Sequence, residues 1–358
     1  MRIDQVVVTA SPGDAVTGAA LDLRGLLRRA APSDVFARYV HPSLDDDVFL
    51  LDRWAARSAT TRSDLVIFHA SIGEPDVFAF LGEHARRLMV VYHNISPPEA
   101  FAPYDRRFSQ LLAEGRAEVA ALARRAVAAV AVSEYNAAEL GAYGYRNVKV
   151  APLPVDPARL TSVTPDPATA AAAAALPGPV VLFVGQVLPH KRPELLVAGG
   201  HVAATWLDAE ARLVVVGAHR LPPYSRALTT YADELNVADR VVWAGHVDDT
   251  VLAAWYRRAD VFVTASEHEG FCAPLVEAMA FDVPVVARAF AAIPETLAGA
   301  GVLLDRNDGA AVLAEAAMHL AGGGPGTDAV VAAGRRRLAS VDPDRARAEL
   351  LAAVMETA

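Results

Sequence analysis

Short apolar runs rich in β-branched residues alternate with amphipathic segments along the whole chain. This alternation is typical of a parallel sheet covered by helices on both faces. In the first half it predicts strands at residues 3–9, 35–40, 65–70, 88–93, 127–132 and 148–151. It also predicts helices at residues 14–29, 104–125 and 133–143, the last beginning with Ser133 as its cap. The first half therefore reads as one doubly wound sheet.

A second alternation follows a change in composition. Residues 152–157 read Pro-Leu-Pro-Val-Asp-Pro, and residues 161–179 are rich in Pro, Thr and Ala without strand periodicity. We interpret this stretch as the interdomain linker and its solvated continuation. Six more strands are predicted beyond it, at residues 180–184, 213–216, 241–244, 261–265, 283–287 and 302–304. Glycines at 322–326 then precede a helical region at 328–355.

The length of 358 residues exceeds the size at which one hydrophobic core usually stops growing. We therefore expect an α/β protein of two domains, residues 1–152 and 153–337, followed by a C-terminal helix at 338–358. No apolar run approaches the ~18 residues of a membrane span, and the start enters a strand pattern without a leader, so we expect a cytoplasmic location.

Charge and cysteine content narrow the function classes. The net charge of -9 gives no support to nucleic-acid binding, which leans on a cationic surface. Cys272 is the only cysteine, so the chain has no disulfide framework and no thiolate zinc cluster. Arginine pairs dot the first half, and we interpret most of them as solvated helix faces. The alternative is a basic strip that contacts an anionic lipid or acceptor, which leaves peripheral membrane contact open.

The loop after the strand at 261–265 carries the most informative pattern. Glu269 and Glu277 are separated by seven residues, and Pro274 lies where a helix would begin. We expect Glu277 in the first turn of that helix and Glu269 before it, on either side of free backbone N–H groups that attract an anion. A diphosphate there leaves Glu277 for a ribose diol and Glu269 for sugar hydroxyls. The alternative is that Glu277 only favours the helix dipole and Glu269 is a surface residue.

Three other loops follow predicted strands. Gly185 lets a ligand approach the backbone, and Lys191 at the mouth of the next helix can reach a phosphate, although the spacing is not that of a Walker loop. Gly13 precedes a helix, a commonplace arrangement. His93 follows an apolar strand beside a Pro-Pro turn, which makes it a better site candidate than a histidine on a helix face.

Together these segments carry a family resemblance. Residues 266–280 resemble the Glu-x7-Glu signature of the GT-B retaining glycosyltransferases, also called glycosyl transferases group 1. Residues 183–193 are similar to that family's phosphate loop, and residues 242–247 to its nucleobase-contacting strand end. Residues 92–98 are similar to a segment of some members. The resemblance is strong from residue 180 to residue 304 and looser before it.

The resemblance implies two Rossmann-like domains facing a cleft, with the last helix returning to the first domain. It implies transfer of a sugar, with retained anomeric configuration and no metal or other cofactor, from a nucleotide-diphosphate sugar bound by the second domain. The acceptor, held mainly by the first domain, is a glycan, a lipid-linked sugar or a small molecule. No nucleic acid is implied as a partner.

The resemblance also implies residue roles. Lys191 and the amides of residues 271–273 would stabilise charge on the departing diphosphate, Glu269 would orient the sugar, and Glu277 would anchor the ribose. His93 would contact the sugar or acceptor without being the general base. The expected catalytic residues are thus His93, Lys191 and Glu269. The full expected substrate-binding set is Gly13, Asp14, Gly185, Gln186, Lys191, His246, Val247, Glu269, Gly270, Phe271, Cys272, Ala273, Leu275 and Glu277.

The chain departs from the family pattern at two places. Gln186 stands where many members carry arginine, so Lys191 carries more of the load unless Arg192 or His190 compensates. The glycine-rich turn after the first strand is reduced to Pro12-Gly13-Asp14. Two rival functions stay open: a sugar-nucleotide epimerase of the same architecture, and a non-catalytic two-lobed sugar-binding module.

Two further classes are less well supported. A glycosidase needs carboxyl groups on opposite sides of a scissile bond, whereas Glu269 and Glu277 belong to one loop and one helix start. A nicotinamide oxidoreductase lacks its Gly-x-Gly-x-x-Gly fingerprint.

Overall fold

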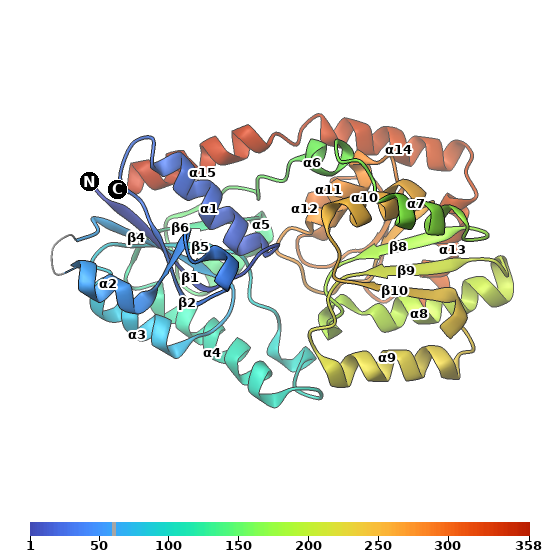
Figure 1. The fold of residues 1–358 in the computed structure, drawn as a ribbon, viewed down its shortest axis with the longest axis horizontal. Coiled ribbons are helices and arrows are strands. Elements are labelled where there is room, and N and C mark those ends of the chain that lie inside the picture. Colours follow the sequence, from blue (N-terminus) through green and yellow to red (C-terminus); the bar gives the residue numbers. More distant parts are fainter. Residues whose placement is uncertain (59–61) are drawn as a thin grey trace. The chain divides into compact units, whose positions relative to one another are not determined.

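The computed structural model describes residues 1–58 and 62–358 and divides the chain into two compact units (Figure 1). The first unit comprises Met1–Ala102, Arg106–Pro154 and Pro343–Ala358, and the second comprises Pro103–Asp105 and Val155–Asp342. Each unit contains one parallel sheet with helices around it, which confirms the predicted pair of doubly wound α/β domains.

The first unit has a seven-stranded sheet in the order β3-β2-β1-β4-β5-β6-β7. Its strands are β1 (Ile3–Ala10), β2 (Val35–Val40), β3 (Val48–Leu50), β4 (Leu65–Ala70), β5 (Leu88–Tyr92), β6 (Ala126–Ala131) and β7 (Val148–Val150). Its helices are α1 (Ala15–Leu27), α2 (Leu51–Ser58), α3 (Pro75–His84), α4 (Arg106–Leu122), α5 (Glu134–Ala142) and α15 (Pro343–Thr357). The order changes direction between β1 and β4, which is the topological switch point of such a sheet.

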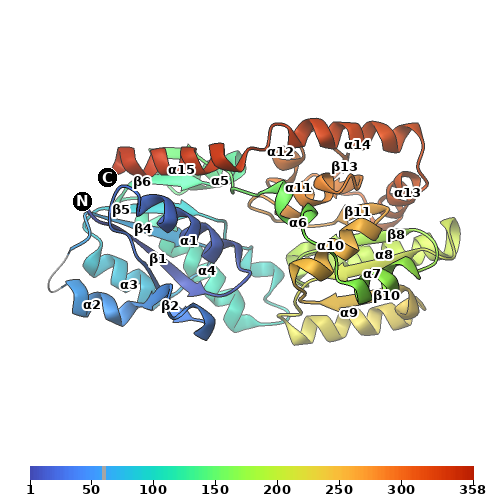
Figure 2. The same ribbon diagram turned by 45° about the horizontal axis from the view of Figure 1, so that its top comes forward.

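The C-terminal helix α15 belongs to the core of this first unit. Leu350, Ala353 and Val354 are buried with residues of β1, β4 and β5. Figures 1 and 2 show α15 beside α1, with which it is in contact. Arg347 of α15 also lies 3.7 Å from Asp22 of α1. The C-terminal helix thus packs against the sheet formed by the N-terminal residues.

The second unit has a six-stranded sheet in the order β10-β9-β8-β11-β12-β13. Its strands are β8 (Val180–Val184), β9 (Arg212–Val216), β10 (Val241–Gly245), β11 (Val261–Thr264), β12 (Val285–Arg288) and β13 (Val302–Leu304). Its helices are α6 (Pro157–Thr161), α7 (Pro167–Ala174), α8 (Pro193–Val202), α9 (Pro222–Glu234), α10 (Asp249–Arg258), α11 (Ala273–Ala280), α12 (Ile293–Leu297), α13 (Ala310–Ala321) and α14 (Pro325–Leu338). Here the switch point lies between β8 and β11.

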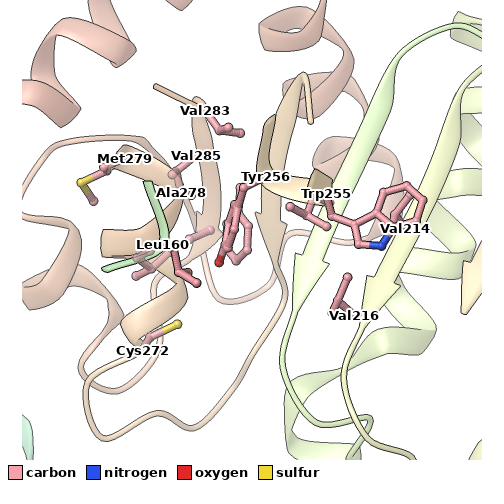
Figure 3. Close-up of a cluster of buried hydrophobic side chains, with 14 of the residues drawn as sticks. Leu160, Val214, Val216, Trp255, Tyr256, Cys272, Ala278, Met279, Val283 and Val285 are labelled. Atoms are coloured by element: carbon pink, nitrogen blue, oxygen red, sulfur yellow. The ribbon is translucent and has the colours of Figure 1, made fainter. Parts of the chain in front are cut away.

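A cluster of buried apolar side chains holds α10 and α11 against this second sheet (Figure 3). Trp255 and Tyr256 come from α10, and Met279 comes from α11. They pack with Val214 of β9 and Val285 of β12, so the helix that carries Glu277 is fixed to the strands by its apolar face. Burial of this kind is the dominant favourable contribution to folding.

The structure corrects three expectations about local structure. Residues 161–179 are not merely a linker, because α7 lies within them, begins at the N-cap Asp166 and packs against α10. Its alanine run has a high intrinsic helix propensity. The helical region at 328–355 is two helices, since Pro343 cannot continue α14 and begins α15 instead. Strand β3 was not predicted; it continues directly into α2 at Leu51, so no turn residues separate the two elements in the sequence.

Candidate functional site

The loops after β8 and β11 meet at the switch point of the second sheet. The two strands pair side by side although about 80 residues separate them, with Val261 opposite Val181. The carboxyl ends of parallel strands lie at one edge of a sheet, so residues 185–192 and 265–272 leave the sheet next to one another. Two of the segments that the sequence singled out are therefore neighbours in the fold.

Lys191 and Glu269 are brought together at this edge. The Lys191 Nζ donates to Glu269 Oε1 at 2.5 Å, and the two side chains are only 18% and 11% exposed. A charge-assisted hydrogen bond in a partly buried place is stronger than the same pair in water. The pair thus holds a cation and a carboxylate in fixed positions beside the start of α11.

The start of α11 is well suited to an anion. Cys272 is its N-cap, with a left-handed φ of 73°, and no side chain caps the terminus. Pro274 has no N–H and the Leu275 amide bonds to the Cys272 carbonyl oxygen, so the Ala273 amide and the helix dipole are what this terminus offers a negatively charged group. Thr296 Oγ1 donates to the carbonyl oxygen of Phe271 at 2.5 Å, which anchors the loop from α12.

The single cysteine is not a nucleophile here. Burial, and after it the nearby Glu269 carboxylate, raise the pKa of the Cys272 thiol well above its usual range. Because only the thiolate reacts readily, the side chain contributes packing to the apolar cluster. Leu275 likewise lies in that cluster, fully buried, and its amide bonds to the Cys272 carbonyl at 3.1 Å. Gly270, by contrast, is half-buried in the loop between Glu269 and Phe271.

Glu277 lies deeper in α11 than the sequence predicted. The helix starts at Ala273, so Glu277 falls in its second turn and does not flank the first free amides. Its Oε2 accepts a hydrogen bond from Tyr256 at 2.9 Å, and its Oε1 lies 3.5 Å from Arg159 Nη2. Burial raises the pKa of Glu277, while Tyr256 and Arg159 oppose that shift.

Sequence analysis missed both partners of Glu277. Tyr256 lies in α10, where an aromatic residue with an apolar neighbour reads as core. Arg159 lies in α6, inside the stretch interpreted as linker, and it also forms an ion pair with Asp249. No short motif connects these positions, so only the fold could bring them to Glu277. The carboxylate is thereby held in one orientation by two helices.

Glycines end three neighbouring strands at the same edge. Gly185 follows β8, Gly217 follows β9, and Gly245 ends β10. A Cβ atom on Gly217 would lie 1.9 Å from the carbonyl oxygen of Gly185, so no other residue fits there. The Gly185 amide donates to Val216 O at 2.9 Å and the Gly217 amide to Gly245 O at 2.8 Å. The edge thus presents main chain without side chains.

Beyond these glycines lie three more residues of the expected set. Gln186 and His246 are exposed, whereas Val247 is half-buried against the apolar cluster. Gly245 adopts a left-handed φ of 70°, which turns the chain before His246. Gln186 and His246 thus follow β8 and β10, which are separated in the sheet by β9.

Neither neighbour of Lys191 replaces the cation that Gln186 lacks. Arg192 forms ion pairs with Glu194 and Glu267. Glu267 is shared with Arg288 of β12 at 3.1 Å, so Arg192 is committed to a structural network. The pKa of His190 is lowered by burial and by the charge of Lys191, so its ring stays neutral near pH 7. Neither residue therefore adds a free cation beside the Lys191–Glu269 pair.

In the first unit, His93 takes part in a buried chain of hydrogen bonds. Its Nε2 lies 2.9 Å from His69 Nδ1, and His69 Nε2 lies 2.8 Å from Gln5 Oε1. Burial lowers the pKa of His93 to about 4, and it lowers that of His69 well below the usual range. Both rings are therefore neutral near pH 7. Sequence analysis missed His69 and Gln5, because both interrupt apolar strands without any motif.

Side-chain bonds hold the segment that follows His93. Asn94 has a left-handed φ of 86°, and its Nδ2 donates to Asn136 Oδ1 of α5 at 2.7 Å. Arg116 of α4 donates to the carbonyl oxygen of Ile95 at 2.6 Å. Tyr92 donates to Glu139 of α5 at 2.6 Å. The turn is thus tied to two helices, which is the support that a functional side chain needs.

The loop after β1 gives less support to its two predicted site residues, Gly13 and Asp14. Asp14 is the N-cap of α1 and accepts from the amide and the hydroxyl of Thr17, both at 2.8 Å. Its carboxylate therefore stabilises the helix start. Gly13 is exposed and has a φ of 72°. The structure leaves both residues at the edge of the first sheet, in the other unit from Lys191 and Glu269.

Two properties concern the described residues as a whole. Among residues 1–58 and 62–358, no group of three or more His, Cys, Asp or Glu side chains is arranged to hold a metal ion. Within the same ranges, no helix combines the length and apolar character needed to cross a membrane.

Comparison with known proteins agrees with this architecture. Residues 178–322 match the family model described as glycosyl transferases group 1. A D-inositol 3-phosphate glycosyltransferase of Xylanimonas cellulosilytica is 34% identical over 218 residues, which cover 58% of this chain and 51% of that protein. The chain thus spans about half the length of that curated relative, and about a third of two others.

Two solved structures share the whole fold. Anabaena HepE in complex with UDP-glucose has a TM-score of 0.76 at 17% identity, with both chains covered completely. Sucrose-phosphate synthase of Thermosynechococcus elongatus has a TM-score of 0.74 at 19% identity and covers 98% of this chain and 97% of its own. At such identities the likeness establishes the fold, which confirms the predicted GT-B architecture of two Rossmann-like domains.

Proposed function

Because residues 178–322 match the family model of the group 1 glycosyl transferases and the chain has the GT-B fold, we propose that it transfers a sugar from a nucleotide-diphosphate donor to a hydroxyl of an acceptor. The observation that carries this proposal is the Lys191–Glu269 pair beside the uncapped start of α11. A cation and the positive end of the helix dipole there suit a diphosphate, and the adjacent carboxylate suits sugar hydroxyls.

The proposed reaction retains the anomeric configuration. The acceptor oxygen bonds to the anomeric carbon on the face from which the diphosphate leaves, while the bond from that carbon to the phosphate oxygen breaks. The acceptor proton passes to an oxygen of the departing diphosphate. Lys191 and the amides at the start of α11 stabilise the charge that develops on this leaving group, so the proposal needs no metal ion. A neutral His93 contacts the sugar or the acceptor.

The names of related proteins support this class of donor. HepE was solved with UDP-glucose, and one relative of Mycolicibacterium smegmatis is a GDP-mannose-dependent alpha-mannosyltransferase, 35% identical over 144 residues. These donors share a nucleoside diphosphate and differ in base and sugar. We therefore propose the diphosphate as the common element of recognition, with base and sugar decided by the loops around it.

The chain offers a direct test, because Lys149 and Lys191 are its only lysines. Limited acetylation followed by mass spectrometry should show that a bound nucleoside diphosphate protects Lys191. Lys149, in the first unit and 40% exposed beside Glu356, is the internal control. The ligand is chosen by a thermal-shift screen of UDP, GDP, ADP, TDP and CDP, since a ligand of the folded state raises the melting temperature. Equal reactivity of Lys191 with and without a stabilising ligand would refute the proposed site.

The remaining step is to show transfer itself. The protein is incubated with the sugar nucleotide of the selected base, first alone and then with candidate acceptors. An epimerase would change the sugar without an acceptor, and a binding module would change nothing. Sugar transfer to an acceptor with the α or β configuration of the donor preserved is the outcome that the proposal requires.

Glu277→Gln is expected to weaken binding of the nucleoside diphosphate about tenfold, or ~1.4 kcal/mol. The amide keeps the size of the side chain but loses the charge that would accept hydrogen bonds from ribose hydroxyls. Calorimetric titration measures the effect, and Glu234→Gln, an exposed change on α9, is the matched control. Unchanged affinity in a folded Glu277→Gln variant would remove this residue from the ribose site.

Gln186→Arg is expected to tighten nucleoside-diphosphate binding about fivefold at low salt, because it adds a cation beside the phosphates. Arg192 is bound to Glu194 and Glu267, so it does not already fill that role. The gain should shrink as salt is added. Gln186→Met, of similar length and without charge, is the control. Equal or weaker binding by the arginine variant would mean that residue 186 points elsewhere.

A further inference from the structure

The chain Gln5–His69–His93 crosses three neighbouring strands of the first sheet. Gln5 lies in β1 and His69 in β4, and both are fully buried. His93 comes directly after β5, and its amide bonds to Ala70 O of β4 at 2.9 Å. The two imidazole rings also stack, with centroids 5.2 Å apart. Rigid sheet backbone therefore fixes all three positions.

The chemical character of Gln5, at one end of this row of hydrogen bonds, determines which atom donates and which accepts in each link. Gln5 Oε1 can only accept a hydrogen bond, so the His69 Nε2 facing it carries a proton. A neutral His69 then has an unprotonated Nδ1, which can only accept. The His93 Nε2 facing that atom must in turn carry the proton. Each link thus determines the tautomer of the next ring.

The arrangement is unusual because most of the buried side chains of the first unit are apolar. Among the described residues, the buried Gln5 Nε2 has no hydrogen-bond partner. A buried polar group without a partner destabilises the fold. An apolar residue at position 5 would avoid that cost but would leave the buried His69 Nε2 without its acceptor, so Gln5 and His69 form one coupled polar unit.

We propose that Gln5 and His69 are positioning residues that fix the ring orientation and the tautomer of His93, leaving His93 Nδ1 as an unprotonated acceptor for a substrate hydroxyl. This rests on the proposed function only for the identity of the ligand, which is the sugar or the acceptor. Its class is a hydroxyl that donates, since a neutral ring with a protonated Nε2 offers no second donor. In many proteins a neighbouring residue bonds to one ring nitrogen of a functional histidine and thereby orients the other nitrogen toward the ligand.

Nitrogen NMR of the protein without ligand tests the tautomers directly. Histidine labelled with nitrogen-15 gives long-range correlations that distinguish a protonated Nδ1 from a protonated Nε2. His93 and His69 are both expected with the proton on Nε2. His201 supplies the opposite reference in the same spectrum, because its Nδ1 faces the carbonyl oxygen of Leu235 at 2.9 Å and must carry the proton. Single His→Asn variants assign each signal.

The spectrum decides the proposal whether or not the protein proves to be a transferase. Protons on Nε2 of both rings would support it. A proton on Nδ1 of His93, or rapid exchange between its tautomers, would overturn it, because the Gln5 amide would then not set the direction. A failure of the proposed function would instead appear as absence of nucleotide protection at Lys191, with the tautomers unaffected.

The Gln5→Leu variant tests whether the hydrogen bonds from Gln5 through His69 to His93 affect catalysis. It keeps the approximate volume and removes the terminal acceptor, so His93 should populate both tautomers. We expect kcat to fall about tenfold while the affinity for the nucleoside diphosphate stays within twofold, since position 5 lies in the other unit from Lys191 and Glu269. Mixed tautomers with unchanged kcat would contradict a positioning role. If the variant does not fold, the wild-type spectrum still tests the direction of the chain.

Discussion

Lys191→Met is expected to lower kcat/KM about 10²–10³-fold, because it removes the side-chain cation that we propose stabilises the leaving group. The loss should appear mainly in kcat, since charge on the diphosphate grows as the bond to the sugar breaks. The same change also releases Glu269, whose Oε1 accepts from Lys191 at 2.5 Å. Methionine preserves most of the length and apolar stem of the side chain.

Lys149→Met is the matched control, because it removes the other lysine of the chain from an exposed ion pair with Glu356. Exposed pairs of this kind contribute little to stability. Steady-state kinetics of both variants should therefore separate a loss at Lys191 from a general effect of charge. A Lys191→Met enzyme with more than about a tenth of the wild-type kcat/KM would exclude leaving-group stabilisation as its role.

His93→Ala is expected to lower kcat on the order of 10²-fold while leaving the affinity for the free nucleoside diphosphate nearly intact. His93 directly follows β5 of the first unit, whereas the proposed nucleotide contacts all come from the second. A residue that acts only near the reacting carbon affects the rate rather than nucleotide binding. Turnover and calorimetric titration on one preparation measure both quantities.

His41→Ala serves as the control for His93→Ala, because His41 is an exposed histidine of the same unit whose side chain bonds to the nearby Ser43. It should change neither quantity. An equal loss of nucleotide affinity and rate in His93→Ala would place His93 in a structural or phosphate role. Full activity would make it an ordinary residue at the end of a strand.

The alternation of apolar runs and amphipathic segments was enough to predict both sheets. It worked because strands buried on both faces read as unbroken apolar runs, as in residues 180–184. It failed where two elements follow one another without a turn, or where composition misleads. Strand β3 continues directly into α2 at Leu51, and the alanine-rich α7 was read as linker because prolines and threonines flank it.

The residues of the candidate site likewise fall into those that local sequence could predict and those that it could not. Residues close together in sequence could be found from spacing and from their position after a strand, and Lys191 and Glu269 were then joined by the strand order. Partners from distant elements could not. Arg159 reaches Glu277 from α6, and His69 reaches His93 from the neighbouring strand. Such contacts depend on how helices and strands pack, which no local pattern records.

The three glycines that end β8, β9 and β10 have an evolutionary consequence. A ligand bound against Gly185, Gly217 or Gly245 would be recognised by main-chain atoms, which point mutation leaves in place, except that a change to proline removes the N–H. Gly217 cannot even be replaced, since a Cβ would lie 1.9 Å from Gly185 O. The main-chain surface at this edge of the sheet therefore changes little under mutation. A laboratory selection for a new donor would have to draw its useful mutations from the exposed loop positions around it, such as 186 and 246.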